Sequence, residues 1–444
     1  MTCRELTLCL LTEWEEQGKY ANLALSSHKT DALTPEETAR VTALFYTVTE
    51  HLLTLDYTAT ALAGRSGTDI RPHTLRLLRL GLSELLYLDG APDYAVTSET
   101  VGMAENRGET SFVNAILREA IRHRDDGTLP LPDKKKNFAR YLSIRYSVSL
   151  WIVKNYLHIY GESDTEALLS FYEKRRGYDL SVNPLKISRD DYLAKLRELG
   201  IPATPVSDLS VRLASSMPPR ALPGFEDGEF HVQDAASALA VRVLDPRAGE
   251  RVADVAAAPG GKSFSIAERM GDAGEVFSFD LHENKLSLIR SGAARLGLSS
   301  LRVAARDGTD PDPALLGGMD RVLCDLPCSG LGVLAKKPDL RYKSEEGVPE
   351  LPALQKKILS ASARYLKPGG ILVYSTCTLR KEENEEVVAA FLRTHPDFSP
   401  VPFDAFGERC EGMYTAFPPK SGTDGFFVAK LCKNPEKSLG KEKE

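Results

Sequence analysis

The chain is 444 residues long, with 42% hydrophobic residues, 27% charged residues and a formal net charge of −6. This length exceeds the roughly 250–300 residues at which a single hydrophobic core stops growing, so we expect two or three domains. The composition excludes a disordered or fibrous protein, and the acidic balance excludes a global attraction to nucleic acid. Any RNA binding must therefore come from local basic patches.

The first residues and the cysteines bear on location and on metal binding. The apolar run Leu8–Leu11 is short and lies among acidic residues, so it is neither a signal peptide nor a membrane-spanning helix, and we expect a cytoplasmic protein. The seven cysteines are odd in number and form no CxxC pair. This pattern argues against a disulfide framework and against a zinc site, so we expect free thiols and no metal ion.

Residues 6–123 carry apolar residues at helical spacing. Two runs repeat at steps of three and four residues: Leu75, Leu78, Leu82, Leu85 and Leu86 form the first, and Phe112, Val113, Ile116, Leu117 and Ala120 form the second. We therefore predict an all-helical first domain over residues 1–137. Near its end, DDGTLPLPDKKK (125–136) predicts an exposed linker, because Gly, Pro and Lys interrupt any regular pattern.

The remaining sequence changes from mixed to alternating structure. Residues 138–230 combine helical stretches with a proline-rich part, SMPPRALPGF (216–225), and predict a small α/β connector. Residues 231–432 alternate short apolar runs with helical or loop segments, which predicts a parallel doubly wound sheet. The runs are RVADVA (251–256), EVFSFD (275–280), LRVAA (301–305), RVLCD (321–325) and ILVYS (371–375).

The C-terminal part of this region carries one more strand pattern. GFFVAKL (425–431) is expected to supply an antiparallel edge strand, which such sheets often carry. Residues 433–444 are polar and charged and are expected to form a flexible tail.

The stretch ADVAAAPGGKSFSIAERM (253–270) has the pattern of a strand, a glycine turn and a helix. Gly260 and Gly261 lack a Cβ, so a ligand can approach the backbone, and the first turn of the helix presents unpaired N–H groups. The turn matches neither GxGxxG nor a P-loop, because Ala256 stands where the P-loop requires Gly. These residues leave open both a plain strand-to-helix connection and a nucleotide-type cofactor site.

Two acidic residues follow the next strands. Asp280 ends the second strand, where a doubly wound fold places the acid that binds ribose hydroxyls. Asp307 follows the third strand at the same edge of the sheet. An acid before Gly is also a common turn former, so Asp307 is open to both interpretations.

Two of the cysteines differ from the others by position. Cys328 in DLPCSG and Cys377 in ILVYSTC each follow a strand, in a polar loop that solvent and substrate can reach. These strand ends share one crevice, so both thiols and the carboxyl group of Asp325 could reach one substrate. A thiolate can act as a nucleophile in covalent catalysis, and a carboxyl group can stabilise charge during addition. The others, Cys3, Cys9, Cys324, Cys410 and Cys432, are expected to be small buried hydrophobic residues.

Short motifs lie at these strand ends and around them. They are HVQDAAS (231–237), AAAPGGK (256–262), FDLHENKL (279–286), RDGT (306–309), DLPCSGLGV (325–333), YSTCTL (374–379), ENEEVV (383–388) and GTDGFF (422–427). Together they resemble the motifs of the NOL/NOP/Sun-type RNA cytosine-5 methyltransferases, over nearly the whole chain. The helical first domain, with FVNAILR (112–118), resembles the NusB-like RNA-binding module of the subfamily that modifies ribosomal RNA. The resemblance implies a class I Rossmann-like S-adenosylmethionine methyltransferase core, an all-α NusB-like N-terminal domain and a small α/β connector.

The resemblance also implies roles for single residues. Cys377 would be the nucleophile that bonds to cytosine C6, and Cys328 would assist elimination and release of the methylated RNA. Asp325 would contact the cytosine edge, and Lys262 would support the site. The cofactor would be S-adenosylmethionine. Its pocket would be lined by Ala256, Ala257, Ala258, Pro259, Gly260, Gly261, Lys262, Asp280, Asp307 and Asp325.

Small-subunit (16S) ribosomal RNA is the substrate that the resemblance implies. The target cytosine must leave its stack to be attacked, so we expect single-stranded or loop RNA, bound by a monomeric protein. Three basic clusters are candidates for contact with phosphates. They are Arg118, Arg122, Arg124, Lys134, Lys135, Lys136, Arg140 and Arg145; then Lys174, Arg175 and Arg176; then Lys336, Lys337, Arg341 and Lys343.

Two other functions fit parts of the sequence. A nicotinamide-dependent oxidoreductase would account for the glycine turn and Asp280 but leaves DLPCSG unexplained. A catalytically inert RNA-binding factor for ribosome assembly or antitermination would use the helical domain alone. Ser181, where the family commonly has Arg, leaves open whether one contact of the connector is kept.

Overall fold

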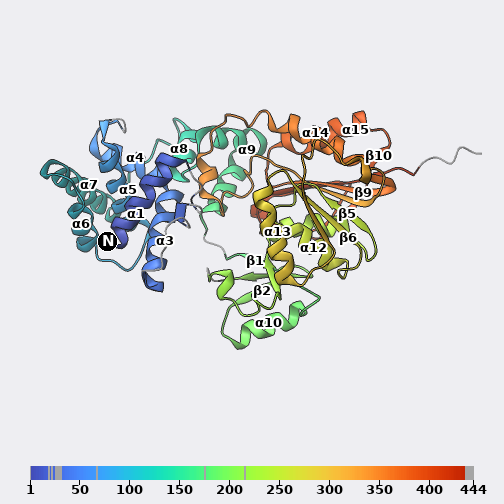
Figure 1. Cartoon of the computed structure of the whole chain (residues 1–444). Helices are drawn as coiled ribbons and strands as arrows, with labels where there is room; N and C mark the ends of the chain where they lie inside the picture. Colours follow the sequence, from blue (N-terminus) through green and yellow to red (C-terminus); the bar gives the residue numbers. More distant parts are fainter. Residues whose placement is uncertain are drawn as a thin grey trace, which may run out of the picture. The chain divides into compact units, whose positions relative to one another are not determined.

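The computed structural model describes residues 2–18, 21, 24–25, 33–66, 69–174, 177–214 and 217–435. The chain forms two compact units, and Figure 1 labels many of their elements. The first unit contains the residues up to Glu173 together with Leu334–Ser344. The second contains Lys174–Val333 and the residues from Glu345 onward.

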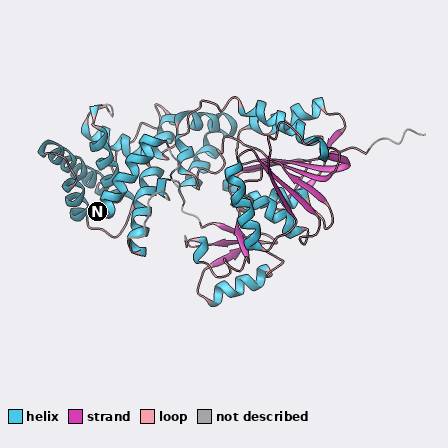
Figure 2. Cartoon of the chain, viewed as in Figure 1, coloured by secondary structure: helices cyan, strands magenta, loops and turns pink. Residues whose placement is uncertain are grey.

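Within the described residues of the first unit, the regular elements are all helical, as the sequence predicts (Figure 2). They are α1 (Cys3–Gln17), α3 (Pro35–Glu50), α4 (Leu52–Ala63), α5 (Pro72–Tyr87), α6 (Asp93–Gly102), α7 (Arg107–Asp125), α8 (Phe138–Arg145), α9 (Leu150–Glu173) and the 3₁₀ helix η4 (Pro338–Tyr342). Thr2 and Thr34 start α1 and α3 with capping boxes, which satisfy N–H groups that the helix leaves free. Among the helices that the structure describes in either unit, none has the length and apolar character needed to cross a membrane.

The apolar repeats of the first unit form its core. Leu78, Leu82 and Leu85 are buried on α5, and Val113 and Leu117 are buried on α7. Burial of such side chains stabilises a fold by about 1.5–3 kcal/mol each. The helical spacing in the sequence therefore predicted the buried face of both helices.

Residues 334–344, which we call the strap, fold with the helical unit although they follow DLPCSGLGV in the sequence. Arg341 is only 3% exposed. Its guanidinium donates hydrogen bonds to the carbonyl oxygens of Glu50 at the end of α3 and Tyr172 in α9, at 2.9 and 3.0 Å. A third bond goes to the strap's own Leu334 carbonyl at 3.1 Å. The buried guanidinium thus ties three distant parts of the sequence together.

The connector is a small antiparallel sheet in the second unit, with strand order β2-β3-β1-β4. Leu180, Tyr192 and Phe230 are fully buried in its core. Ser181 is 3% exposed within β1, so the position where the family commonly has Arg is a buried strand position here. The elements are β1 (Asp179–Val182), α10 (Arg189–Glu198), β2 (Ala203–Pro205), β3 (Ser210–Leu213), η2 (Pro219–Ala221) and β4 (Phe230–Val232).

The central sheet has the order β10-β14-β9-β8-β5-β6-β7, with β13 also paired to β14. The five predicted runs form β5 to β9, which are parallel to one another. The strands are β5 (Arg251–Asp254), β6 (Glu275–Asp280), β7 (Leu301–Ala305), β8 (Met319–Asp325), β9 (Leu366–Thr376), β10 (Phe398–Pro400), β13 (Met413–Ala416) and β14 (Phe426–Lys433). The prediction of a parallel doubly wound sheet is confirmed.

The helices of this unit cover both faces of the sheet, as Figure 1 shows for α12 and α14. On one face, Val252 and Leu323 pack against α11, α12 and α13. On the other, Ala253 and Val322 pack against α14 and α15. Because strand side chains alternate between faces, two covered faces require continuous apolar runs such as those of β8 and β9. The helices are α11 (Ala235–Leu244), α12 (Gly261–Arg269), α13 (Glu283–Leu296), α14 (Leu351–Ala363), α15 (Glu385–Thr394) and α16 (Pro418–Ser421).

The predicted edge strand lies inside the sheet. Strand β14 is antiparallel to β9, as expected, but its other side pairs with β10 and β13. The prediction of an edge position is therefore wrong. Two short neighbouring strands, which carry little apolar periodicity, satisfy the N–H and C=O groups that an edge strand would leave unpaired.

The strand order reverses between β5 and β8. From β5 the chain adds β6 and β7 on one side, and it then returns to add β8 and β9 on the other. In open α/β sheets, ligands bind at such a switch point, outside the carboxyl ends of the strands. The glycine turn after β5 and the DLPCSG loop after β8 both leave the sheet at this place.

Candidate active site

Three segments meet at this switch point: the glycine turn after β5, the end of β8 and the end of β9. Lys262 Nζ lies 2.6 Å from Asp325 Oδ2. Ser375 Oγ donates a hydrogen bond to Asp325 Oδ1 at 2.8 Å, because the register of β8 and β9 pairs these two residues. The side chains of Lys262 and Asp325 are 14% and 25% exposed, so water screens this ion pair only in part.

Cys328 and Cys377 are brought together by the pairing of β8 with β9. Their Sγ atoms lie 3.4 Å apart, and both cysteines are reduced and half-buried. The hydrogen bond to Cys377 and burial raise the pKa of Cys328 well above that of an ordinary thiol. Cys328 therefore keeps its proton at neutral pH and can donate a hydrogen bond to its neighbour.

Lys262 remains a cation despite its burial. Burial by itself would lower the pKa of this amine, but the carboxylates of Asp325 and Asp254 and the nearby Cys377 sulfur raise it above its ordinary value. The ammonium also lies 5.6 Å from the centre of the Phe426 ring. A fixed positive charge thus stands beside the Cys377 thiol.

The glycine turn depends on Gly260 for a structural reason. Its φ of +116° lies in a region that residues with a side chain rarely adopt. A Cβ at this position would also come within 2.4 Å of the Phe264 ring. Phe264, Ala267 and Met270 are buried on the inner side of this helix.

Asp280 and Asp307 both bind backbone groups. Asp280 accepts hydrogen bonds from Ala258 N at 3.2 Å and from His282 N at 3.0 Å, and it is 8% exposed. It therefore fixes the glycine turn from the end of β6. Asp307 is exposed and accepts from the backbone and hydroxyl of Thr309, at 2.8 and 2.7 Å, so its turn-forming role is present in the structure.

The residues at these strand ends fit S-adenosylmethionine. Carboxylates from β6 and β8, with Asp307 after β7, can accept hydrogen bonds from ribose hydroxyls and from an ammonium group. A Cβ at Gly261 would meet only Gln233 Nε2, at 3.8 Å, so the backbone there is open to a ligand. The assignment of single contacts to the cofactor stays a prediction.

Asp254 is an acidic residue of this region that sequence reasoning missed. It is 1% exposed at the end of β5, and its Oδ2 accepts a hydrogen bond from Ser263 Oγ at 2.7 Å. Burial, reinforced by the charge of Asp325, raises the pKa of Asp254 to about 7. The signal in the sequence is an acid within the apolar run RVADVA.

The remaining cysteines only partly follow the prediction. Cys324 and Cys410 are buried, as expected for small hydrophobic residues. Cys3 and Cys432 are half-buried. Cys9 is exposed on α1, so the prediction of burial is wrong for Cys9.

The structure changes the interpretation of the basic clusters. Arg341 cannot contact phosphates, because its guanidinium is buried against three carbonyl groups in the helical unit. Arg124 pairs with Asp93, Arg145 with Glu173 and Lys134 with Glu166. Lys336 and Lys337 are exposed. Arg175 and Arg176 lie outside the described residues.

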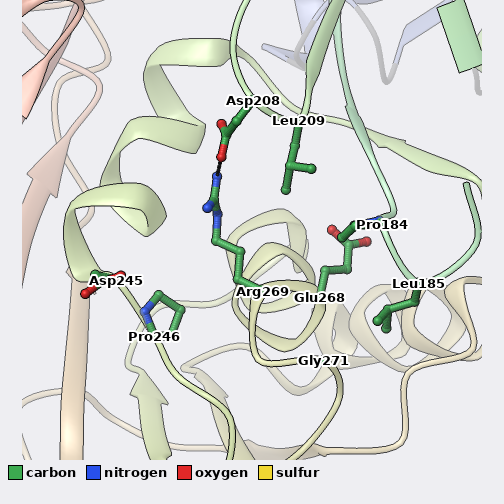
Figure 3. A pocket seen from close by; sticks show the side chains of 9 residues that line it. All are labelled: Pro184, Leu185, Asp208, Leu209, Asp245, Pro246, Glu268, Arg269 and Gly271. Atoms are coloured by element: carbon green, nitrogen blue, oxygen red, sulfur yellow. Dashed lines mark hydrogen bonds and ion pairs between the residues drawn. The ribbon is translucent and has the colours of Figure 1, made fainter. Parts of the chain in front are cut away.

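A cavity of about 450 Å³ lies in the second unit, at the far end of α12 from Lys262. Figure 3 shows Arg269 reaching Asp208 across it, with Nη2 and Oδ2 2.6 Å apart. Glu268 also lines it, but its carboxylate oxygens are shielded from solvent. None of the predicted site residues lines this cavity, so it is separate from the paired thiols.

One group of potential metal ligands occurs in the described part of the helical unit: His73, Glu105 and Glu109. Glu109 already accepts hydrogen bonds from Thr74 Oγ1 and from Glu105 N, and it lies 3.0 Å from His73 Nδ1. These bonds give Glu109 a structural role at the start of α7.

Comparisons with known proteins agree with this arrangement. The sequence matches the family 16S rRNA methyltransferase RsmB/F over residues 241–432. It matches the NusB family over residues 1–122 and the Methyltr_RsmF/B-like, ferredoxin-like domain over residues 149–219. These matches also remove the nicotinamide-dependent alternative.

Curated relatives match over almost their full length. The chain is 34% identical to the probable ribosomal RNA small subunit methyltransferase B of Synechocystis sp., covering 98% of this chain and 100% of the relative. The probable methyltransferase B of Bacillus subtilis is also 34% identical, covering 97% and 98%. A solved methyltransferase homologue from Pyrococcus horikoshii has a TM-score of 0.57 and 29% identity, covering 66% of this chain and 97% of the homologue. The chain therefore belongs to the 16S rRNA methyltransferase RsmB/F family of S-adenosylmethionine-dependent enzymes.

Proposed function

We propose that this protein methylates C5 of a cytosine in small-subunit (16S) ribosomal RNA through a covalent bond between Cys377 Sγ and cytosine C6. The observation that carries the proposal is the 3.4 Å separation of the Cys328 and Cys377 sulfur atoms beside the Lys262–Asp325 ion pair. A lone thiol could serve packing alone. Two thiols, a cation and a carboxylate at a switch point provide a nucleophile, a proton carrier and groups that stabilise charge.

In the first step Cys377 Sγ, as a thiolate, adds to C6. The electron pair of the C5–C6 double bond then makes C5 nucleophilic, and Asp325 contacts the edge of the base where charge develops. S-adenosylmethionine supplies the methyl group that C5 takes up. Lys262 holds Asp325 in place through the 2.6 Å ion pair.

Release requires loss of the C5 proton. When Cys377 Sγ is bonded to C6, it can no longer take part as a thiolate in the hydrogen bond that raises the pKa of Cys328. The thiolate of Cys328 is then easier to form, and it takes the proton from C5. The C5–C6 double bond re-forms, the C6–S bond breaks, and its electron pair returns to Cys377.

The substrate is inferred from the family and from surface charge. Relatives are named for ribosomal RNA of the small subunit, and the NusB match covers residues 1–122. We infer that a monomer binds single-stranded or loop RNA. The exposed side chains of Lys336 and Lys337 would then contact the phosphates. We also propose a functional division into residues 1–137, 138–230 and 231–432, with a tail at 433–444; residues 436–444 lie outside the described part. This division by role differs from the two compact units, in which residues up to Glu173 fold with the helical unit.

The test uses labelled methyl transfer to 16S ribosomal RNA, with bisulfite sequencing to identify 5-methylcytosine. Cys377→Ala should abolish transfer and leave RNA affinity unchanged. Cys328→Ala should accumulate a protein–RNA adduct that survives denaturing electrophoresis. If the wild-type protein binds the RNA but transfers no methyl group, the alternative of an inert RNA-binding assembly or antitermination factor replaces this proposal.

A further inference from the structure

Each of the two thiols is flanked by buried polar contacts that the proposed chemistry does not use. These contacts converge on two consecutive residues of the ENEEVV motif, Glu383 and Asn384, which are 0% and 1% exposed. They lie where the 3₁₀ helix η5 (Lys381–Glu383) meets α15. A buried carboxylate and a buried amide are costly unless every polar atom finds a partner, so their contacts indicate what they support.

Glu383 binds the backbone around Cys328. Its Oε2 accepts a hydrogen bond from Ser329 N, the residue after the thiol, at 2.8 Å. The same oxygen accepts from Gln355 Nε2 at 3.2 Å. Gln355 Nε2 also donates to Pro327 O, the residue before the thiol, at 2.9 Å. Both peptide groups that flank Cys328 are therefore held by one carboxylate and one amide.

Asn384 binds the residues around Cys377 in the same way. Its Oδ1 accepts a hydrogen bond from Thr376 Oγ1, on the residue before the thiol, at 2.5 Å. Its Nδ2 donates to Thr378 O, on the residue after the thiol, at 3.0 Å. Thr376 and Thr378 are fully buried, so these bonds are shielded from competing water.

A further bond joins the two halves. Ser329 Oγ lies 2.7 Å from Thr378 Oγ1, so the residues that follow the two thiols contact each other directly. Tyr374 of β9, itself fully buried, donates its hydroxyl to Glu383 O and anchors the pair to the sheet. One continuous polar network therefore holds the residues on either side of both thiols.

We infer that Glu383 and Asn384 are positioning residues with divided roles: Glu383 aims Cys328 for release of the product, and Asn384 aims Cys377 for attack on the base. The inference rests on the proposed roles of the two thiols. The network binds the residues on both sides of each sulfur: both flanking peptide groups at Cys328, and the Thr376 hydroxyl and the Thr378 carbonyl at Cys377. A change in it therefore moves the thiol without removing it. Misplacement of a reacting group by about 1 Å lowers rates about 100-fold.

The test uses two isosteric substitutions. Both carboxylate oxygens of Glu383 accept hydrogen bonds: Oε2 from Ser329 N and Gln355 Nε2, and Oε1 from Arg380 Nη1 at 3.4 Å. In Glu383→Gln one of these oxygens becomes an NH₂ group, which is itself a donor and cannot accept from them. Asn384→Asp keeps the acceptor for Thr376 but turns a carboxylate oxygen toward the carbonyl of Thr378. Glu386→Gln, an exposed acid-to-amide change in the first turn of α15, is the matched control.

The expected readouts differ in kind between the two variants. Both should turn over about 100-fold more slowly, with the KM for RNA unchanged. Glu383→Gln should accumulate the denaturation-resistant protein–RNA adduct, as Cys328→Ala does, whereas Asn384→Asp should lack it, as Cys377→Ala does. Glu386→Gln should match the wild type. A general loss of folding would lower turnover in both variants without separating them by adduct.

The controls keep this inference distinct from the proposed function. Melting temperature and affinity for S-adenosylmethionine are measured for every variant to show that the fold is retained. If Cys328→Ala yields the adduct but Glu383→Gln and Asn384→Asp behave alike, the divided roles are wrong and the proposed function stands. If Cys328→Ala yields no adduct, the proposed division of labour between the thiols fails first.

Discussion

Gly332 and Gly425 hold their backbones in direct contact behind Cys377. Gly425 N donates a hydrogen bond to Gly332 O at 2.8 Å, and Gly332 N donates to Cys377 O at 2.9 Å. A Cβ at Gly332 would lie 2.1 Å from Gly425 O and 2.8 Å from Cys377 O. Because Gly332 and Gly425 lack a Cβ, their backbones can lie close enough for Gly332 N to hold the carbonyl of Cys377.

Gly332→Ala is predicted to reduce methyl transfer far more than it reduces RNA binding. The added methyl group must push the backbone of Cys377 or of Gly425 away, and a shift of about 1 Å at a reacting group lowers rates about 100-fold. Single-turnover transfer measured beside equilibrium RNA binding checks this. Gly102→Ala, where a Cβ meets nothing within 4 Å, is the control and should leave both quantities unchanged.

The Lys262–Asp325 ion pair is predicted to show strong coupling. Lys262→Met leaves the partly buried Asp325 carboxylate without its cation, and Asp325→Leu leaves the Lys262 ammonium without its carboxylate. Each substitution should therefore lower the free energy of unfolding by about 3 kcal/mol. The double variant should lose less than the sum of the two. Urea denaturation of the four proteins in a double-mutant cycle measures the coupling, and additive losses would contradict it.

Asp254 is predicted to make the second unit less stable as the pH rises. Its folded pKa, about 7, lies above the ordinary 3.8, so its stabilising contribution is complete below about pH 3.8 and is lost as the pH rises through 7. Above pH 7 the buried carboxylate must carry a charge, which costs at most about 4 kcal/mol for such a shift. Asp254→Asn should remove this decline. Free energies of unfolding measured at pH 5.5 and 8.5 check the sign: relative to the wild type, Asp254→Asn should be more stable at pH 8.5 than at pH 5.5.

Arg341 and Lys337 are predicted to act on different properties although they lie close in sequence. Arg341→Met removes the buried guanidinium that donates to three carbonyl groups and should destabilise the helical unit by about 3 kcal/mol. Lys337→Met should leave stability unchanged and reduce the slope of log affinity against log salt concentration by about 1. Thermal unfolding and RNA titrations at several salt concentrations separate the two. Equal effects of both substitutions on the salt slope would contradict the buried role of Arg341.

The sequence predicted those features that depend on local pattern. Continuous apolar runs identify β5 to β9, and the parallel direction of these strands predicts that Cys328 and Cys377 lie at one edge of the sheet. The pairing of β8 with β9 brings them to 3.4 Å. The residue types and their places at strand ends were sufficient to predict this proximity, because the carboxyl ends of parallel strands all lie at one edge of the sheet.

Features that depend on distant partners could not be predicted in this way. Arg341 lies in a run of basic residues that looks solvated, and only the carbonyls of Glu50 and Tyr172 show that it is buried. The inner position of β14 likewise depends on β10 and β13, which are too short for a recognisable period. Glu383 resembles any helix-starting acid until Ser329 and Gln355 are seen to bind it.

The strap has a practical consequence for dissecting the protein. A fragment that stops at Glu173 would retain every long helix of the NusB-like half but would lack Arg341, and it would also lack Asp339, whose carboxylate accepts a hydrogen bond from the Trp14 indole at 2.8 Å. Such a truncation removes the partners that the strap gives to the Trp14 indole and to the carbonyls of Glu50 and Tyr172. To express the helical unit alone with all its contacts, residues 334–344 have to be joined to residues 1–173 in one chain. That design cuts the chain directly after the loop that carries Cys328.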